Sequence, residues 1–115
     1  MIEVGNAIEL LNATSGDISD SEGDTLSKDI EGLKVFLPGQ FIPIICVNEG
    51  VCPAFARIDK VTITQQTTTV EFTVIKGAKD VCEAAYQQWS MVSGNSVIGS
   101  YRSKTSNSRG AKFHL

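Results

Sequence analysis

The sequence predicts an α+β domain in which a mainly antiparallel sheet of five to six strands carries two helices, with closure into a small barrel as an alternative. Two apolar repeats at helical spacing and several β-rich runs bounded by turn residues lead to this prediction. The composition, 42% hydrophobic and 20% charged, is that of a globular chain. We expect residues 1–115 to form a single domain, since a chain of this length buries about two-thirds of its extended surface.

The first 24 residues contain one apolar repeat followed by an acidic, polar stretch. Val4, Ala7, Ile8 and Leu11 lie at the spacing of one helical face, which predicts an N-terminal helix over residues 3–12. Residues 14–24 contain a single large apolar side chain, so too little surface could be buried to order them. We expect a mobile acidic loop there.

From residue 33 onward the sequence changes to short β-rich runs. The runs 41–47 and 51–58 flank an Asn-Glu-Gly turn and form a hairpin that contains Pro43 and Pro53. Because proline has no N–H to donate, the hairpin is hard to extend sideways near these positions. Two interpretations stay open, with the first favoured: an edge or bulge inside the fold, or a projecting arm. The arm would expose an apolar surface made of Phe41, Ile42, Ile44, Ile45, Val51 and Phe55.

A second hairpin follows, with apolar residues alternating with threonines. A turn at Gln66-Thr67 would pair Ile63 with Val70 and Val61 with Phe72, which places one apolar face on the core.

Residues 81–93 are predicted to form an amphipathic helix. Asp80 is a suitable N-cap and Gly94 a suitable C-terminal cap, and the apolar residues between them include Tyr86 and Trp89. A pocket beside Tyr86 and Trp89 would lie between this helix and the sheet. Residues 96–101 are predicted to add a last strand, followed by a basic polar tail over 103–115.

Charge is distributed unevenly along the chain. Residues 1–31 hold eight acidic side chains and one basic one, whereas residues 32–115 hold five acidic and nine basic ones. The basic residues of the C-terminal segment are Arg102, Lys104, Arg109 and Lys112. They favour a nucleic-acid accessory role as one alternative, although a pI near 5.0 makes a nucleic-acid partner the less favoured one.

No catalytic or metal-binding constellation is recognisable. The one histidine, His114, is the penultimate residue, and the three cysteines, Cys46, Cys52 and Cys82, match no paired zinc-ligand spacing. Cys46 and Cys52 flank the hairpin turn and could face each other as a disulfide, but reduced, buried thiols are preferred. Carboxylates from Asp20 to Glu31 have calcium-loop spacing without its glycine, so a solvated acidic loop is favoured. We therefore expect no enzyme activity, no cofactor and no metal.

The leading functional hypothesis is a non-enzymatic protein-binding or assembly module, with an accessory or viral structural protein as one form of it. Its partner would be another protein or a second copy of the chain. The alternative from another class is a small-ligand carrier or minor enzyme that uses the pocket beside Trp89. The chain begins without a signal peptide and has no apolar run long enough to span a bilayer, which predicts a soluble, cytoplasmic protein with no membrane partner.

Overall fold

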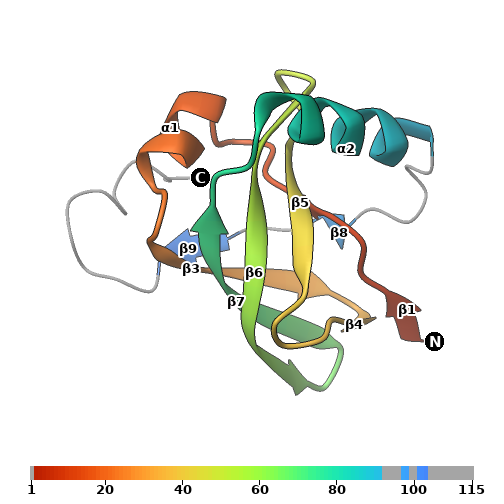
Figure 1. The fold of residues 1–115 in the computed structure, drawn as a ribbon. Helices are drawn as coiled ribbons and strands as arrows, with labels where there is room; N and C mark the ends of the chain where they lie inside the picture. The colour runs from red at the N-terminus through yellow and green to blue at the C-terminus, as the bar shows by residue number, and fades with distance from the viewer. Residues whose placement is uncertain (1, 92–96, 99–100, 104–115) are drawn as a thin grey trace.

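The computed structural model describes residues 2–91, 97–98 and 101–103, and the side chains of residues 4–91. It is an α+β fold in which a curled mixed sheet forms a half-barrel and two helices pack against it (Figure 1). The sheet order is β8-β2-β5-β6-β7-β3-β9, and a separate parallel ladder joins β1 to β4. The strands are β1 (Ile2–Val4), β2 (Ile8–Glu9), β3 (Thr25–Glu31), β4 (Leu33–Val35), β5 (Phe41–Cys46), β6 (Val51–Thr64), β7 (Thr67–Ile75), β8 (Val97–Ile98) and β9 (Tyr101–Ser103), and the helices are α1 (Ser15–Asp20) and α2 (Lys79–Met91).

The predicted α+β class is confirmed, but the sheet is less uniformly antiparallel than expected. The ladders joining β5 to β6, β6 to β7 and β3 to β7 and β9 are antiparallel, whereas β2 pairs in parallel with both β5 and β8. Both parallel pairs involve β2, a two-residue strand within the segment that the sequence predicted as a helix.

The first hairpin confirms the bulge and not the arm. Pro43 pairs with Phe55, as expected, and the register then shifts between Ile44 and Cys46. Since β5 lies between β2 and β6, it is an inner strand of the sheet. Its parallel ladder with β2 is formed by Ile44 and Ile45, after Pro43, where each residue has an N–H to donate.

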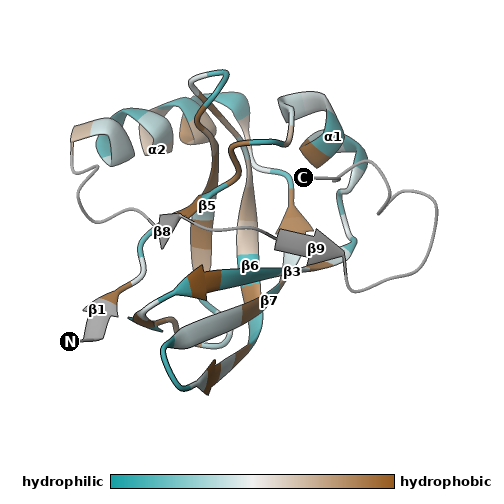
Figure 2. Ribbon diagram, turned by 180° about the vertical axis from the view of Figure 1, so that it is seen from behind, coloured by the Kyte–Doolittle hydropathy of each residue, from teal (hydrophilic) through white to brown (hydrophobic). Residues whose placement is uncertain are grey.

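The main core fills the concave side of the curled sheet. Alternate residues of the inner strands point into it and α1 contributes Ile18, which is fully buried. Figure 2 shows that the hydrophobic segments follow the strands, whereas the turn between β5 and β6 is hydrophilic. The inward-facing residues of the sheet include Ile8, Leu26, Ile30, Ile42, Ile44, Ala54, Ala56, Ile58, Val70, Phe72 and Val74.

A buried lysine bridges the opening of the half-barrel. Lys28 lies between Leu26 and Ile30 in the alternation of β3, and its side chain is fully buried. Its Nζ donates a hydrogen bond of 2.6 Å to the carbonyl oxygen of Glu9 on β2. The two strands are not neighbours in the sheet order, so this contact connects the two sides of the opening. Closure into a small barrel, the alternative that the sequence left open, is not complete: the sheet forms a half-barrel.

The predicted helix over residues 3–12 is wrong. This segment contains β1 and β2, and Val4 is 71% exposed, contrary to its expected place on a buried face. Ile8 and Glu9 pair with Ile44 and Ile45, and the N–H of Leu10 donates to the carbonyl of Ile45. A four-residue repeat is weak evidence for a helix, and here pairing with β5 satisfies the backbone instead.

The predicted loop over residues 14–24 is also wrong in part, because residues 15–20 form α1. Thr14 is the N-cap, and its hydroxyl accepts a hydrogen bond from the N–H of Asp17. Asp17 adds a negative charge to the first turn, where the helix dipole favours it. One fully buried side chain, Ile18, is enough to anchor so short a helix to the core.

The second hairpin forms with a different register from the one expected. Thr64 pairs with Thr67, so the turn is Gln65-Gln66, and Val61 pairs with Val70 rather than with Phe72. Gln65 adopts a φ of 52°, a left-handed conformation that the sequence did not signal. The shift leaves Ile63 half exposed at the end of the ribbon.

The helix predicted over residues 81–93 is present as α2, although it begins at Lys79, so Asp80 lies in the first turn and is not the cap. The last predicted strand is divided into β8 and β9. The tail over 104–115 lies outside the described residues, and Arg102 is described by its backbone alone. Within the described residues, no helix has the length and apolarity needed to cross a membrane.

Candidate functional site

Helix α2 and the strands beneath it form a second, smaller apolar cluster. Ala7, Ile45, Cys52 and Cys82 are its buried members, and Val47, Phe55, Ala85, Tyr86 and Trp89 pack around them partly exposed. Because this cluster is small and α2 rests on it along one face, a hollow remains on each side of the helix. We call these hollows the Tyr86 cavity and the Trp89 cavity.

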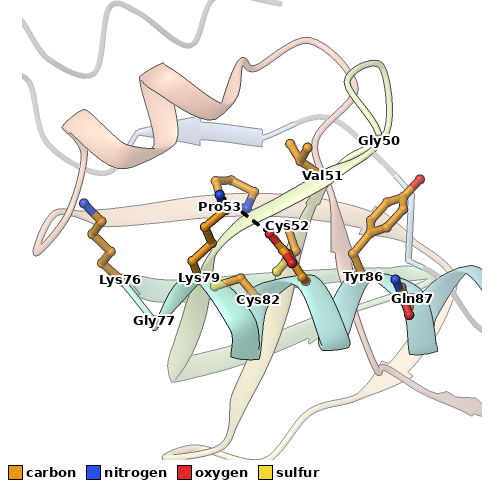
Figure 3. A pocket seen from close by; sticks show the side chains of 11 residues that line it. Gly50, Val51, Cys52, Pro53, Lys76, Gly77, Lys79, Cys82, Tyr86 and Gln87 are labelled. Atoms are coloured by element: carbon orange, nitrogen blue, oxygen red, sulfur yellow. Dashed lines mark ion pairs between the residues drawn. The ribbon is translucent and has the colours of Figure 1, made fainter.

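The Tyr86 cavity has a volume of about 440 Å³ and lies between the start of β6 and the first three turns of α2 (Figure 3). Its apolar wall includes Val51, Pro53 and the ring of Tyr86, and the side chains of Cys52 and Cys82 meet at its base. Lys76, Lys79 and Glu83 stand at its rim. The full lining is Gly50, Val51, Cys52, Pro53, Lys76, Gly77, Lys79, Cys82, Glu83, Tyr86 and Gln87.

Two glycines allow the walls of this cavity to approach each other. A Cβ on Gly50 would lie 3.3 Å from the Oη of Tyr86, and Gly50 has a φ of 69° that favours glycine in any case. A Cβ on Gly77 would lie 3.0 Å from the ring of Phe55 and 3.3 Å from the Sγ of Cys82. Glycine at these two positions therefore sets how closely the β5–β6 turn and the β7–α2 connection meet the helix.

The thiol of Cys52 is buried and stays protonated at neutral pH. Burial raises the pKa of Cys52 to about 12, with the neighbouring Cys82 adding to the shift, and the Sγ of Cys52 donates to the carbonyl of Ala54 at 3.3 Å. Burial likewise raises the pKa of Cys46 to about 12, with Glu49 and Asp17 nearby. A thiol that stays protonated at neutral pH is a poor nucleophile.

The disulfide alternative required Cys46 and Cys52 to face each other across the hairpin, and they do not. Cys46 pairs with Val51 because the bulge shifts the register, and its side chain belongs to the main core, whereas that of Cys52 belongs to the cluster under α2. All three cysteines are free and buried, as the preferred interpretation expected.

The rim of the Tyr86 cavity has an excess of positive charge. Lys79 and Glu83 form an exposed ion pair, with Nζ and Oε1 4.0 Å apart, which contributes little to stability. Lys76 is exposed and makes no ion pair with the side chains that the structure describes. One positive charge at the rim is thus left to a ligand or to solvent.

The Trp89 cavity lies on the other side of α2 and has a volume of about 240 Å³. Its lining is Asn6, Pro43, Phe55, Ala85, Gln88 and Trp89. The rings of Tyr86 and Trp89 lie 5.5 Å apart at an angle of 40°, which is a favourable aromatic contact. The sequence placed both aromatic residues beside one pocket, whereas the structure assigns them to different cavities.

The predicted interaction surface is divided between the core and the exterior. Ile42, Ile44 and Ile45 are buried, so their side chains offer no surface, and Phe55 is partly buried under α2. Phe41 and Val51 remain exposed, by 56% and 36%. The sequence analysis missed three further exposed apolar residues, the Val4–Val35 pair of the β1–β4 ladder and Leu37 in the connection that follows it.

No group of three or more His, Cys, Asp or Glu side chains suited to a metal ion occurs within the described ranges. The carboxylates considered for calcium lie on different elements: Asp20 ends α1, and Glu31 ends β3.

Comparison with known proteins gives one weak structural likeness. No protein-family model and no curated protein matches the chain. The crystal structure of protein ytmB from Bacillus subtilis resembles it with a TM-score of 0.49 and 12% sequence identity, over 68% of this chain and 91% of that one. A likeness of this strength carries no functional argument, so function has to be argued from the cavities themselves.

Proposed function

We propose that the protein binds a small amphipathic molecule, with an apolar body and an anionic end, in the Tyr86 cavity. The observation that carries this proposal is a cavity of about 440 Å³ with an apolar wall and a rim of excess positive charge. Its volume is in the range of pockets that take small organic ligands. The proposal keeps the class of the ligand carrier that the sequence analysis held as an alternative, but moves the site from the pocket beside Trp89 to the cavity beside Tyr86.

The wall favours an apolar body. Burial of apolar ligand surface against Val51, Pro53 and Tyr86 contributes about 25 cal/mol for each Å² removed from water. Figure 3 shows Tyr86 and Val51 bordering the upper part of the cavity and the cysteines at its base. Because the thiol of Cys52 stays protonated, we propose binding without a covalent step.

The rim favours an anionic end. Glu83 is engaged by Lys79, whereas Lys76 stands at the edge of the cavity with no acidic partner among the described side chains. An ammonium group at an exposed rim adds a modest, salt-sensitive attraction to a carboxylate or sulfonate. The apolar wall therefore supplies most of the affinity, and Lys76 supplies a preference.

A matched pair of fluorescent probes tests both parts. 8-Anilinonaphthalene-1-sulfonate has the apolar rings and the anion, and N-phenyl-1-naphthylamine has the same rings without the anion. We expect saturable 1:1 binding of both by fluorescence titration, with the sulfonate bound a few-fold tighter. That preference should disappear in Lys76→Ala and at about 0.5 M salt, because the lysine provides it.

Two neighbouring glutamines provide the control variants. Gln87 lines the Tyr86 cavity and Gln88 lines the Trp89 cavity, and both are exposed on α2. Gln87→Phe should weaken binding of both probes at least tenfold by occupying the cavity, while Gln88→Phe should leave it unchanged. Equal effects of the two variants, or no saturable binding, would contradict the proposal.

A protein contact stays as a second proposed function, on a different observation. Val4, Val35, Leu37 and Phe41 are 71%, 40%, 63% and 56% exposed. Val4 pairs with Val35 in the β1–β4 ladder, and Leu37 and Phe41 belong to the segment that follows β4. Neighbouring large apolar side chains that stay exposed are typical of interaction surfaces. Size-exclusion chromatography with light scattering tests it: Leu37→Glu should dissociate any oligomer, and a monomer at all concentrations would refute self-assembly.

A further inference from the structure

Two residues that line the Trp89 cavity each carry a buried polar atom with unused hydrogen-bonding capacity. Within the described part of the chain, the Nε1 of Trp89 and the Oδ1 of Asn6 are shielded from solvent and have no hydrogen-bond partner. Both residues line the same cavity. A buried polar group without a partner costs about 1–3 kcal/mol, so each of these two atoms calls for an explanation.

The two atoms have complementary roles. An indole N–H can only donate, and an amide oxygen can only accept. In the folded protein the Nε1–H of Trp89 does not donate a hydrogen bond to the Oδ1 of Asn6. A ligand that uses both must therefore carry an acceptor for Trp89 and a donor for Asn6.

The rest of the lining restricts the charge and shape of such a ligand. Pro43, Phe55, Ala85 and the Trp89 ring are apolar, Gln88 is neutral, and none of the six lining residues is charged. An ionised ligand would lose its hydration without gaining a counter-charge, which is expensive. A volume of about 240 Å³ is below that of most drug-sized pockets and suits a single ring.

We infer that the Trp89 cavity is a binding site for a small, uncharged, planar ligand that carries both an acceptor and a donor, such as an aromatic carboxamide or a nucleobase. Its carbonyl or ring nitrogen accepts from the Nε1–H of Trp89, and its N–H donates to the Oδ1 of Asn6. This site is separate from the Tyr86 cavity and differs from it in ligand charge, so the two assignments stand or fall independently.

Binding requires a small rearrangement of the cavity wall. Neither polar atom is reached by solvent in the empty protein. Gln88 is exposed on α2 and lines the cavity, so its side chain is free to change rotamer. The hydrogen bonds that a ligand makes with the two buried atoms favour the rearranged state, since a ligand shifts a conformational equilibrium by its differential affinity for the two states.

The indole N–H resonance of Trp89 provides a direct readout, because the chain has a single tryptophan. Benzamide is the probe, acetophenone is the matched ring with an acceptor and no donor, and benzoate is the charged analogue. In ¹⁵N–¹H correlation spectra, benzamide should shift the indole resonance saturably. It should bind about tenfold tighter than acetophenone, the ratio expected for one further hydrogen bond, and benzoate should not bind.

Variants localise the effect. Gln88→Phe should weaken benzamide binding at least tenfold, whereas Gln87→Phe, on the other side of the helix, should leave it unchanged. Asn6→Leu should reduce the affinity for benzamide to that for acetophenone. Should Asn6→Leu fail to fold, the comparison of the three probes on the wild-type protein gives the same answer.

Three results would overturn the inference. The first is the absence of a saturable indole shift with benzamide, which would mean that the hollow takes only water. The second is equal affinity for benzamide and acetophenone, which would mean that Asn6 is not a ligand-binding group. The third is equal weakening by Gln87→Phe and Gln88→Phe.

Discussion

Between pH 8 and pH 10.5, the wild-type protein is expected to gain up to about 3 kcal/mol of stability relative to a Lys28→Met variant. The fully buried side chain of Lys28 loses its hydration on folding, which lowers its pKa from 10.5 to about 8, although the nearby Glu9 opposes the shift. In this window the unfolded chain binds a proton that the folded chain does not. Stability therefore rises with pH until the unfolded lysine is also neutral, near pH 10.5.

The measurement is guanidinium chloride unfolding of both proteins at half-unit intervals from about pH 7 to about pH 11. Met fills nearly the same volume without a charge, so the difference between the two free energies of unfolding isolates Lys28. The buried thiols would otherwise confuse the result, but both proteins contain them and their contribution cancels. A difference that does not change with pH would show that Lys28 is hydrated, and that it does not bridge β2 and β3 as a buried group.

The thiols of Cys46 and Cys52 are expected to react with iodoacetamide at pH 8 about a thousandfold more slowly in the folded protein than in the unfolded chain. Only the thiolate reacts, and burial raises each pKa from 9.0 to about 12, which lowers the thiolate fraction by about three orders of magnitude. The same shift makes folding less favourable above pH 9, where the unfolded thiols lose protons that the folded ones keep. Each further pH unit costs about 1.4 kcal/mol per thiol up to the folded pKa.

Mass spectrometry after proteolysis gives the rate at each cysteine, and the same chain in about 6 M guanidinium chloride is the control. The experiment is done on the protein without added ligand. Comparable rates for the folded and unfolded chain at Cys52 would mean that the base of the Tyr86 cavity is open to water, contrary to the structure.

The fold class follows from local patterns, while several elements depend on contacts that no local pattern contains. Pro43 and Pro53 correctly indicate an irregular hairpin. A missing N–H limits strand pairing in an edge strand and in an inner strand alike, so this prediction does not depend on the position of the strand in the sheet. The spacing of Ile8 and Leu11 suggests a helix. The strand at Ile8–Glu9 forms instead because β5 is available as a parallel partner, with Ile8 paired to Ile44, 36 residues further along the chain. Long-range pairing of this kind overrides weak local preference.

Two of the differences have signals in the sequence itself. Thr14 followed three residues later by Asp17 is a helix N-terminus pattern, which is easily missed because the segment is otherwise polar. The alternation of Leu26, Lys28 and Ile30 places a lysine on the apolar face of a strand, which indicates a buried charge. The left-handed conformation of Gln65 has no such signal.

The candidate sites were only partly predictable. The spacing of Tyr86 and Trp89 on a helix indicates that both approach the sheet, and they do. That they face different cavities depends on how α2 lies across β5 and β6, which follows from the small side chains beneath it and from the absence of a Cβ at Gly50 and Gly77. Asn6 and Trp89 are 83 positions apart, and only the folded structure places both residues in the wall of one cavity.

The most direct test of the proposed function is a ¹⁵N–¹H correlation map of the labelled protein during titration with 8-anilinonaphthalene-1-sulfonate. We expect saturable shifts of the backbone N–H groups at residues 50–52, 76–77, 79 and 82–87, with residues around Val35 and Phe41 unaffected. Shifts centred instead on Val4, Val35, Leu37 and Phe41 would contradict the proposal, because they would show that the probe binds the exposed apolar surface and not the Tyr86 cavity.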